Sequence, residues 1–287
     1  MAKNPLKNLL ELNLSILLIS SAGVLVRFIE LDPTQIAFWR GFIALFLLGG
    51  FVVYQKKQFQ IEKGKDRWLL FISTIFFGLH WYTYFYALQV SSVAIGMLSL
   101  YTFPVLTALL EPLYFKTKFN KRHLLLALIV LVGLYLMAPE IDFSDKNTKG
   151  VLLGVMSAFF FAFRNLTMKK NSQKYETPVL MFYQFLGLAI GFGPFLWVYN
   201  TANTWNFLPY LIGLSIFATA IGHNLFIKSF RNFNISTASI ISSAQPVYGI
   251  VMGFVFLNEM PNFHILIGGL VILSTVFVES YYTRDET

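Results

Sequence analysis

The sequence predicts an all-α integral membrane protein with ten transmembrane helices, arranged as two inverted five-helix repeats. Three observations predict this fold: the composition, ten apolar runs of membrane-spanning length, and the placement of Lys and Arg between them. Of the 287 residues, 56% are hydrophobic and 13% are charged, against about 25% charged in a typical soluble domain. A soluble fold with so little charge would expose large apolar patches to water, so we expect lipid to be the solvent.

Ten apolar runs are long enough to cross a membrane as helices, which need about 20 mainly apolar residues. Strands of a β-barrel would need only about 10 residues of alternating polarity. Turn-forming pairs such as Asp32-Pro33 and Met260-Pro261 separate neighbouring runs. No small-residue cleavage site follows the first run, so we expect a retained span rather than a signal peptide. The predicted spans cover residues 10–28, 34–54, 67–88, 92–115, 122–138, 149–169, 177–199, 206–228, 234–257 and 262–282.

The basic residues predict the orientation of these spans. With the N-terminus placed inside, the inside segments hold 17 of the 22 Lys and Arg residues. The outside segments hold three, namely Arg27, Lys146 and Lys149, and Arg40 and Arg164 lie within spans. Cytoplasmic loops of membrane proteins carry such an excess of basic residues. The alternation therefore supports ten spans with both termini in the cytoplasm.

The two halves of the chain resemble each other in sequence. When Pro104 is aligned with Pro246, the segment ALIVL at residue 127 falls on GLVIL at residue 269. Pro33, which opens the second span, likewise matches Pro178, which opens the seventh. We therefore predict one five-helix repeat over residues 1–142 and a second over residues 143–287. Because five is odd, the copies must have opposite orientations, as in secondary transporters whose binding site lies at the repeat interface.

Several short motifs, spread over nearly the whole chain, carry a family resemblance. They are FWRGFIALFLL after Asp32-Pro33, the prolines of spans four and nine, the endings ALIVLVGLYL and GLVILSTVFV, and FLNE, which ends at Glu259. With them the chain resembles the drug/metabolite transporter superfamily, in its EamA-type ten-span branch. The resemblance implies a monomeric or homodimeric carrier, often an exporter of amino acids or other metabolites, with a central cavity between the halves. The chain departs from the family at Thr117, where a Glu is frequent.

Charged residues inside the spans need partners or a function, because a charge at the centre of a span costs about 2.5–3.5 kcal/mol on insertion scales. Arg164 and Glu111 lie at similar predicted depths, so we expect an ion pair in or beside the cavity. A static clamp between helices, or a snorkelling Arg, would explain them equally. Arg40 and Glu259 both lie towards the outside, and we expect them to pair and to brace or gate that end.

Two histidines fall at nearly equivalent positions of the repeats, His80 in span three and His223 in span eight. Histidine titrates near neutral pH, so each could carry a coupling proton. Alternatively, each is a neutral side chain hydrogen-bonded to a neighbouring helix.

Polar and aromatic residues near these positions predict a substrate cavity. Pro104 and Pro246 free backbone carbonyls within their spans, which is tolerated where a span lines a cavity, and we expect both to act as hinges. Plain packing would also explain part of the aromatic set. The predicted cavity residues are His80, Trp81, Tyr84, Tyr101, Arg164, Asn165, His223, Asn224, Gln245 and Tyr248. Pairs such as Gly150 and Gly154, or Gly187 and Gly191, are spaced to let helices pack closely.

The sequence gives no sign of an enzyme. It contains no Cys, and neither a phosphate-binding loop nor a hydrolase or metalloprotease motif is present. We expect no catalytic residues, no metal and no cofactor. The net charge of +8 could suggest nucleic acid, but the basic residues sit between apolar runs, so no nucleic-acid partner is expected.

These observations predict a secondary-active transporter of small metabolites. The expected partners are a small-molecule substrate and the lipid bilayer. If both Arg residues are paired with Glu, the cavity carries little net charge and suits zwitterions, so amino acids or related amphipathic compounds are the expected cargo, exported by alternating access with possible proton coupling. The alternatives are a channel or facilitator, or a membrane-embedded lipid-modifying enzyme. The short loops suit a multi-pass protein of a bacterial inner (plasma) membrane.

Overall fold

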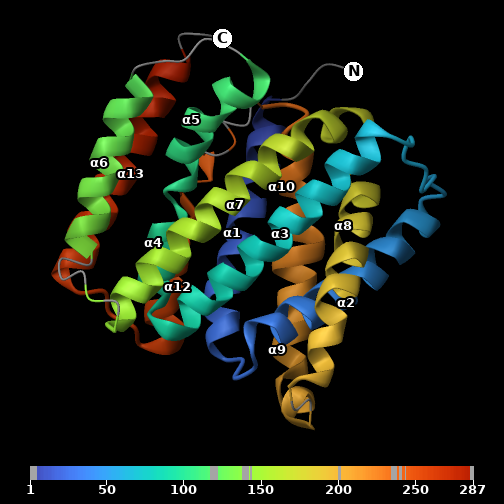
Figure 1. Ribbon diagram of the computed structural model, residues 1–287, viewed down its shortest axis with the longest axis horizontal. Helices are drawn as coiled ribbons and strands as arrows, with labels where there is room; N and C mark the ends of the chain where they lie inside the picture. The colour runs from blue at the N-terminus through green and yellow to red at the C-terminus, as the bar shows by residue number, and fades with distance from the viewer. Residues whose placement is uncertain are drawn as a thin grey trace.

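The computed structural model is a bundle of helices, with no strand among the residues it describes (Figure 1). It describes residues 5–116, 122–137, 142, 144–199, 202–233, 238, 241–242 and 244–284. The first half contains α1 (Pro5–Arg27), α2 (Pro33–Tyr54), α3 (Lys65–Val90), α4 (Val93–Leu100), α5 (Phe103–Phe115) and α6 (Arg122–Met137). The second half contains α7 (Lys146–Lys174), α8 (Thr177–Phe192), the 3-10 helices η1 (Gly193–Trp197) and η2 (Ala202–Phe207), α9 (Leu208–Gly213), the π-helix η3 (Leu214–His223), α10 (Asn224–Ser229), α12 (Ala244–Leu257) and α13 (Phe263–Arg284).

Several helices begin where turn and capping residues predict. Pro33 occupies the first turn of α2, where a missing N–H costs nothing. The side chain of Asp32 caps this helix by accepting a 2.8 Å hydrogen bond from the backbone N–H of Thr34. Asp145 caps α7 in the same way through the N–H of Thr148 at 2.8 Å. Local sequence chemistry thus sets these boundaries before any packing is considered.

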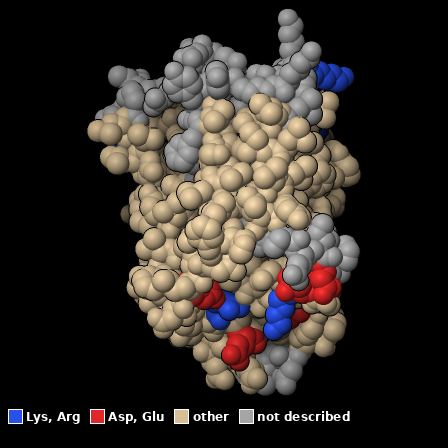
Figure 2. Space-filling model, turned by 90° about the vertical axis from the view of Figure 1, so that its left-hand side faces the viewer, with Lys and Arg blue, Asp and Glu red and all other residues tan. Residues whose placement is uncertain are grey.

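Six helical stretches of the described chain are long and apolar enough to cross a membrane: 6–27, 33–54, 93–115, 146–174, 177–197 and 203–229. Two shorter apolar helices cover residues 244–257 and 263–275. Helical residues lie in all ten predicted ranges, although part of the ninth falls outside the described residues. The surface shown in Figure 2 carries a broad band without charged side chains, above a cluster of charges at the lower end. An integral membrane protein is the fold that fits, and ten spans remain a prediction.

Two predicted spans are interrupted. The span predicted at residues 92–115 breaks at Tyr101 and Thr102, between α4 and α5, so that Pro104 lies in the first turn of a new helix. Pro246 likewise lies in the first turn of α12. The span predicted at residues 206–228 changes from α to π geometry over Leu214–His223. π-Helical segments occur frequently at functional sites.

Helix contacts repeat between the two halves. α3 of the first half packs along α7 of the second, and η3 and α10 of the second half pack along α1 of the first. Similarly, α4 and α5 contact α7, while α12 contacts α1. Two further pairs join equivalent helices of the halves: α2 with α8, and α6 with α13, which lie side by side at the edges of Figure 1. The first helix of each half therefore packs against the third and fourth spans of the other.

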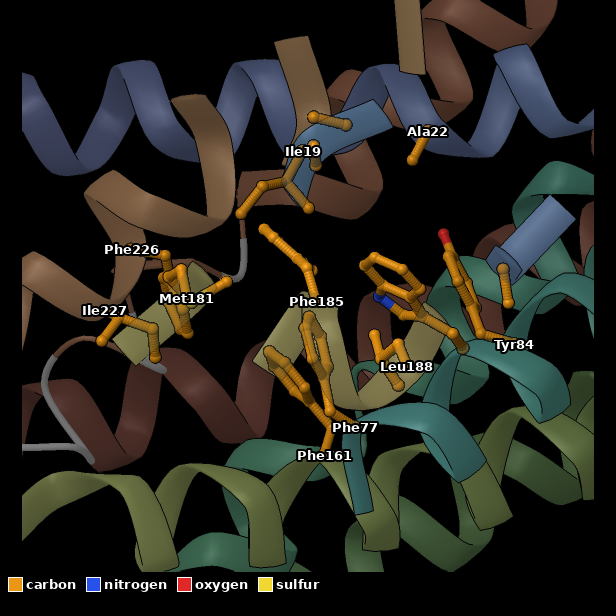
Figure 3. Close-up of a cluster of buried hydrophobic side chains, with 14 of the residues drawn as sticks. Ile19, Ala22, Phe77, Tyr84, Phe161, Met181, Phe185, Leu188, Phe226 and Ile227 are labelled. Carbon is orange, nitrogen blue, oxygen red and sulfur yellow. The ribbon is translucent and has the colours of Figure 1, made fainter. Parts of the chain in front are cut away.

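The centre of the bundle is aromatic. Phe77, Phe161 and Phe185 converge there from α3, α7 and α8, with Ile19 and Ala22 of α1 facing them (Figure 3). The largest fully buried side chains also include Trp81 and two guanidinium groups, those of Arg40 and Arg164. Such a core is unusual, because Arg is rarely fully buried without a charged partner.

Candidate binding cavity

A small cavity lies in this aromatic centre, and both halves of the chain contribute to it. Its volume is about 20 Å³, which is room for roughly one water molecule. Six of the ten predicted cavity residues line it: His80, Trp81, Tyr84, Tyr101, His223 and Gln245. Arg40, which the sequence places towards the outer end, lines the cavity as well. These side chains come from α3, the α4–α5 break, the π-helix and α12. In this conformation the cavity is too small for a metabolite.

Arg40 reaches the cavity from the second turn of α2, and its side chain is 1% exposed. Its Nε donates a short hydrogen bond to the hydroxyl of Thr219 in the π-helix. The guanidinium carbon lies 4.1 Å from the centre of the Trp81 ring, a cation–π contact that desolvation strengthens. Its Nη2 has no hydrogen-bond partner. The repeat-related position holds Phe185, which stacks on Trp81 with 5.9 Å between ring centres.

The predicted ion pair between Arg164 and Glu111 is wrong. Arg164 donates to the side-chain oxygens of Gln184 at 2.7 Å and Asn165 at 3.2 Å. The charge of Glu111 acts instead on Lys169, further along α7. Matching depth along two helices did not place the two side chains on facing surfaces. Neither Arg164 nor Asn165 lines the cavity.

Two aromatic rings separate the guanidinium groups. Arg164 lies 4.3 Å from the ring centre of Phe77, and that ring centre is 4.6 Å from that of Trp81. Arg40 covers Trp81 on the cavity side. Both cations are thus held mainly by aromatic rings and neutral acceptors.

Both histidine rings lie beside Phe77. Nδ1 of His80 is 2.7 Å from the hydroxyl of Ser157, which donates to the backbone oxygen of His80 at 3.0 Å. Because that hydroxyl has one proton, we assign the Nδ1 proton to His80, so that its Nε2 can accept. The His223 ring meets Phe77 edge-on at 5.2 Å, and its Nδ1 has no partner.

Tyr101 and Gln245 join the α4–α5 break to the start of α12. The Tyr101 hydroxyl donates to Oε1 of Gln245 at 2.5 Å. Tyr101 lies three residues before Pro104, and Gln245 lies directly before Pro246. The pair therefore couples the two predicted hinges across the cavity. Asn224 and Tyr248, which were also expected at the cavity, do not line it. Tyr248 packs at the edge of the main core, and the buried Oδ1 of Asn224 has no hydrogen-bond partner.

An ion pair closes one end of the bundle, here called the Arg27 end. Arg27 at the end of α1 pairs with Glu259 at 2.9 Å and donates to the backbone oxygen of Leu88 at 3.1 Å. Glu259 also accepts from the backbone N–H of Val93 at 2.9 Å. The predicted pairing of Glu259 with Arg40 is therefore wrong. Arg40 is buried in the centre of the bundle, whereas Arg27, at the end of α1, lies beside Glu259 in the loop after α12. Thr117, aligned with Glu259 in the first repeat, lies outside the described residues.

The opposite end, here called the Lys57 end, is closed by several ion pairs. Lys57 after α2 pairs with Glu176 before α8 at 2.5 Å. Lys174 at the end of α7 pairs with Asp66 at the start of α3 at 2.9 Å. The hydrogen bond from Lys57 holds the pKa of the Glu176 carboxyl below its ordinary value of 4.5. Ion pairs therefore tie the helices together at both ends of the bundle.

Comparisons with known proteins fit this arrangement. The model of the EamA-like transporter family matches residues 9–138 and, separately, residues 148–281. An uncharacterized transporter of Archaeoglobus fulgidus is 27% identical over 266 residues, covering 92% of this chain and 93% of that protein. The pseudopaline exporter CntI of Pseudomonas aeruginosa is 24% identical over 214 residues, covering 71% of this chain and 72% of that protein.

A solved crystal structure shares the fold. It superimposes with a TM-score of 0.71 at 17% identity, over 97% of this chain and 99% of that one. At this level of identity the likeness concerns the fold alone.

Proposed function

The chain belongs to the EamA-like transporter family, and we propose that it is a secondary-active carrier that moves small amphipathic metabolites through the central cavity by alternating access. The observation that carries this proposal is the position of the cavity. Its lining residues come from both family-matched segments, including Arg40 and His80 from the first and His223 and Gln245 from the second. Binding sites of inverted-repeat transporters lie at such a junction.

We propose ten spans in two inverted repeats, over residues 1–142 and 143–287. The double match of one family model and the mirrored helix contacts support the repeats. The start of α1 and the end of α13 lie at the same end of the bundle (Figure 1), which an even number of spans requires. We place both termini in the cytoplasm and the protein in an inner (plasma) membrane, on the distribution of Lys and Arg.

The ties at the two ends support alternating access. Opening the Arg27 end requires Arg27 and Glu259 to separate, whereas opening the Lys57 end requires the pair Lys57–Glu176 to separate. Ion pairs at both ends, with a cavity of about 20 Å³ between them, fit an intermediate between the two open forms. In this proposal the helices bend at Pro104 and Pro246 as either end opens, and Tyr101 and Gln245 move with them.

Export of small amphipathic metabolites is the transport mode we propose, as a named relative is an exporter. Proton coupling through His80 and His223 is part of this proposal, since both rings border the cavity and imidazole exchanges protons near neutral pH. If transport keeps the same pH dependence after both residues are changed to Gln, proton coupling through them is refuted and the carrier function stands.

The test compares the metabolites of cells that express the wild type, Trp81→Ala or Trp68→Ala. Trp81 lines the cavity, while Trp68 lies on the same helix and is 61% exposed, so it controls for the loss of an indole. We expect a compound that leaves wild-type and Trp68→Ala cells but is retained by Trp81→Ala cells, with saturable counterflow in liposomes. Linear flux without counterflow would indicate a channel. No difference inside or outside the cells, with all proteins in the membrane, would contradict a transport function.

A further inference from the structure

Four buried polar groups around the cavity lack a hydrogen-bond partner. They are Nη2 of Arg40, Nε1 of Trp81, the hydroxyl of Tyr84 and Nδ1 of His223. Most buried polar atoms in native proteins are paired, and leaving one unpaired costs about 1–3 kcal/mol. Four such groups around one cavity indicate a shared partner that this conformation does not supply. The chemistry of that partner can be deduced from the groups themselves.

Three of the four groups are hydrogen-bond donors. The guanidinium of Arg40 and the indole N–H of Trp81 can only donate, and the hydroxyl of Tyr84 carries one proton to donate. A partner for them must present several acceptor oxygens close together. A carboxylate does so, and it forms its strongest and best-oriented hydrogen bonds with a guanidinium group.

The charge balance of the site points the same way. Arg40 and Arg164 are both buried, and a guanidinium stays protonated in proteins. Within the described part of the chain, no Asp or Glu lines the cavity or forms an ion pair with either Arg. Glu259, the expected partner of Arg40, is held by Arg27. The centre therefore carries two positive charges that an anionic ligand would offset.

The absence of acidic side chains from this lining also bears on zwitterions. An amino acid would bring an ammonium group as well as a carboxylate, and the described lining offers that ammonium no carboxylate. It would also lie close to two guanidinium charges. The expectation of zwitterionic cargo depended on Arg–Glu pairs that the structure does not form.

We propose that the transported compound is an organic acid of net negative charge, whose carboxylate binds Arg40, Trp81 and Tyr84 while its apolar body packs against the aromatic wall. This wall is formed by Phe103, Phe161 and Phe226. Because a cavity of about 20 Å³ is too small for the acid, the acid enters when one end opens. The proposal rests on the transport function above and narrows its substrate class.

The experiment profiles acids, amines, zwitterions and neutral metabolites in cells and medium. It compares an empty vector, the wild type, Arg40→Leu, Arg40→Lys and Arg67→Leu. Arg67 lies at the start of α3 away from the cavity and donates to the backbone oxygen of Ile61, so it controls for the loss of an Arg. Membrane insertion is checked for each variant by fluorescence size-exclusion chromatography.

We expect the compounds that the wild type redistributes to be acids without an amine. Arg40→Leu lowers their transport at least tenfold, Arg67→Leu leaves it unchanged, and Arg40→Lys raises the apparent KM at least tenfold with the maximal rate retained. Arg40→Lys alone decides the matter if Arg40→Leu fails to insert. The proposal of an acidic substrate fails if the wild type redistributes amines, neutral compounds or zwitterions, or if Arg40→Lys has the KM of the wild type. The carrier function would stand in either case. If the wild type redistributes nothing, the transport function itself fails.

Discussion

Thr219 holds the guanidinium of Arg40 in place, and its replacement by Val removes that contact with almost no change in shape. Its hydroxyl accepts from Nε of Arg40 and donates to the backbone oxygen of Leu214 at 2.9 Å. A hydrogen bond to a charged group contributes about 1.5–3 kcal/mol. Arg40 already has one unpaired nitrogen, so no other partner is at hand. We expect Thr219→Val to lower the free energy of unfolding by about 2–3 kcal/mol.

The assay is unfolding by SDS titration in mixed micelles, with Thr83→Val as the matched control. Thr83 is also buried, but its hydroxyl bonds only to backbone oxygens of its own helix, those of Leu79 and His80. We expect its replacement to cost less than about 1 kcal/mol, because no charged group loses a partner. Thr219→Ser, which keeps the hydroxyl, should lie near the wild type. Equal losses in Thr219→Val and Thr83→Val would refute the idea that Thr219 anchors a buried charge.

Three further predictions concern packing and the two ends of the bundle. Gly154→Ala should lower the free energy of unfolding by about 1–3 kcal/mol, because the added Cβ would collide with a buried side chain of α4. A Cβ added at Gly191 meets no atom within 4 Å, so Gly191→Ala should be neutral or stabilising by up to about 1 kcal/mol in the same titration. Glu259→Gln should loosen the Arg27 end, so that a cysteine at Ser92 reacts faster with a thiol reagent than in the Glu259 background, and an unchanged rate would contradict the tie. Because the pKa of Glu176 is depressed, its ion pair stabilises the fold above pH 4.5, and this stabilisation is lost as the pH falls through the lowered pKa. The side chain is 47% exposed, so Glu176→Gln should lower the free energy of unfolding by under about 1 kcal/mol at pH 7 and not at all at low pH. An equal loss at both pH values would contradict this role of the ion pair.

The sequence predicted helix boundaries well where local chemistry decides them. Asp32-Pro33 sets the start of α2 because the cap and the proline act within one turn. Pro104 similarly forces a break in its span. The placement of His80, Trp81 and Tyr84 on one helix face follows from their spacing in α3, and the structure brings all three to the cavity.

The pairing of the charges could not be read from the sequence. Hydropathy gives the depth of Arg40 and Arg164 in the membrane, but not the direction in which each side chain points. That direction depends on how the helices rotate against one another, which is set by the packing of the aromatic core. The π-helix that carries Thr219 was missed for a related reason, since its geometry leaves no signature in the hydrophobic pattern.

Alternating access through the cavity is tested most directly by a single cysteine at Leu100, because the chain has no Cys of its own. Leu100 lines the cavity and is 4% exposed, whereas Leu125, 60% exposed on α6, provides a lipid-facing control. A membrane-impermeant methanethiosulfonate reagent is added to one side of the membrane at a time. We predict that Leu100→Cys reacts from either side and that its reaction stops transport, while Leu125→Cys does neither. Reaction of Leu100→Cys from neither side, or unaltered transport after its reaction, would contradict the account.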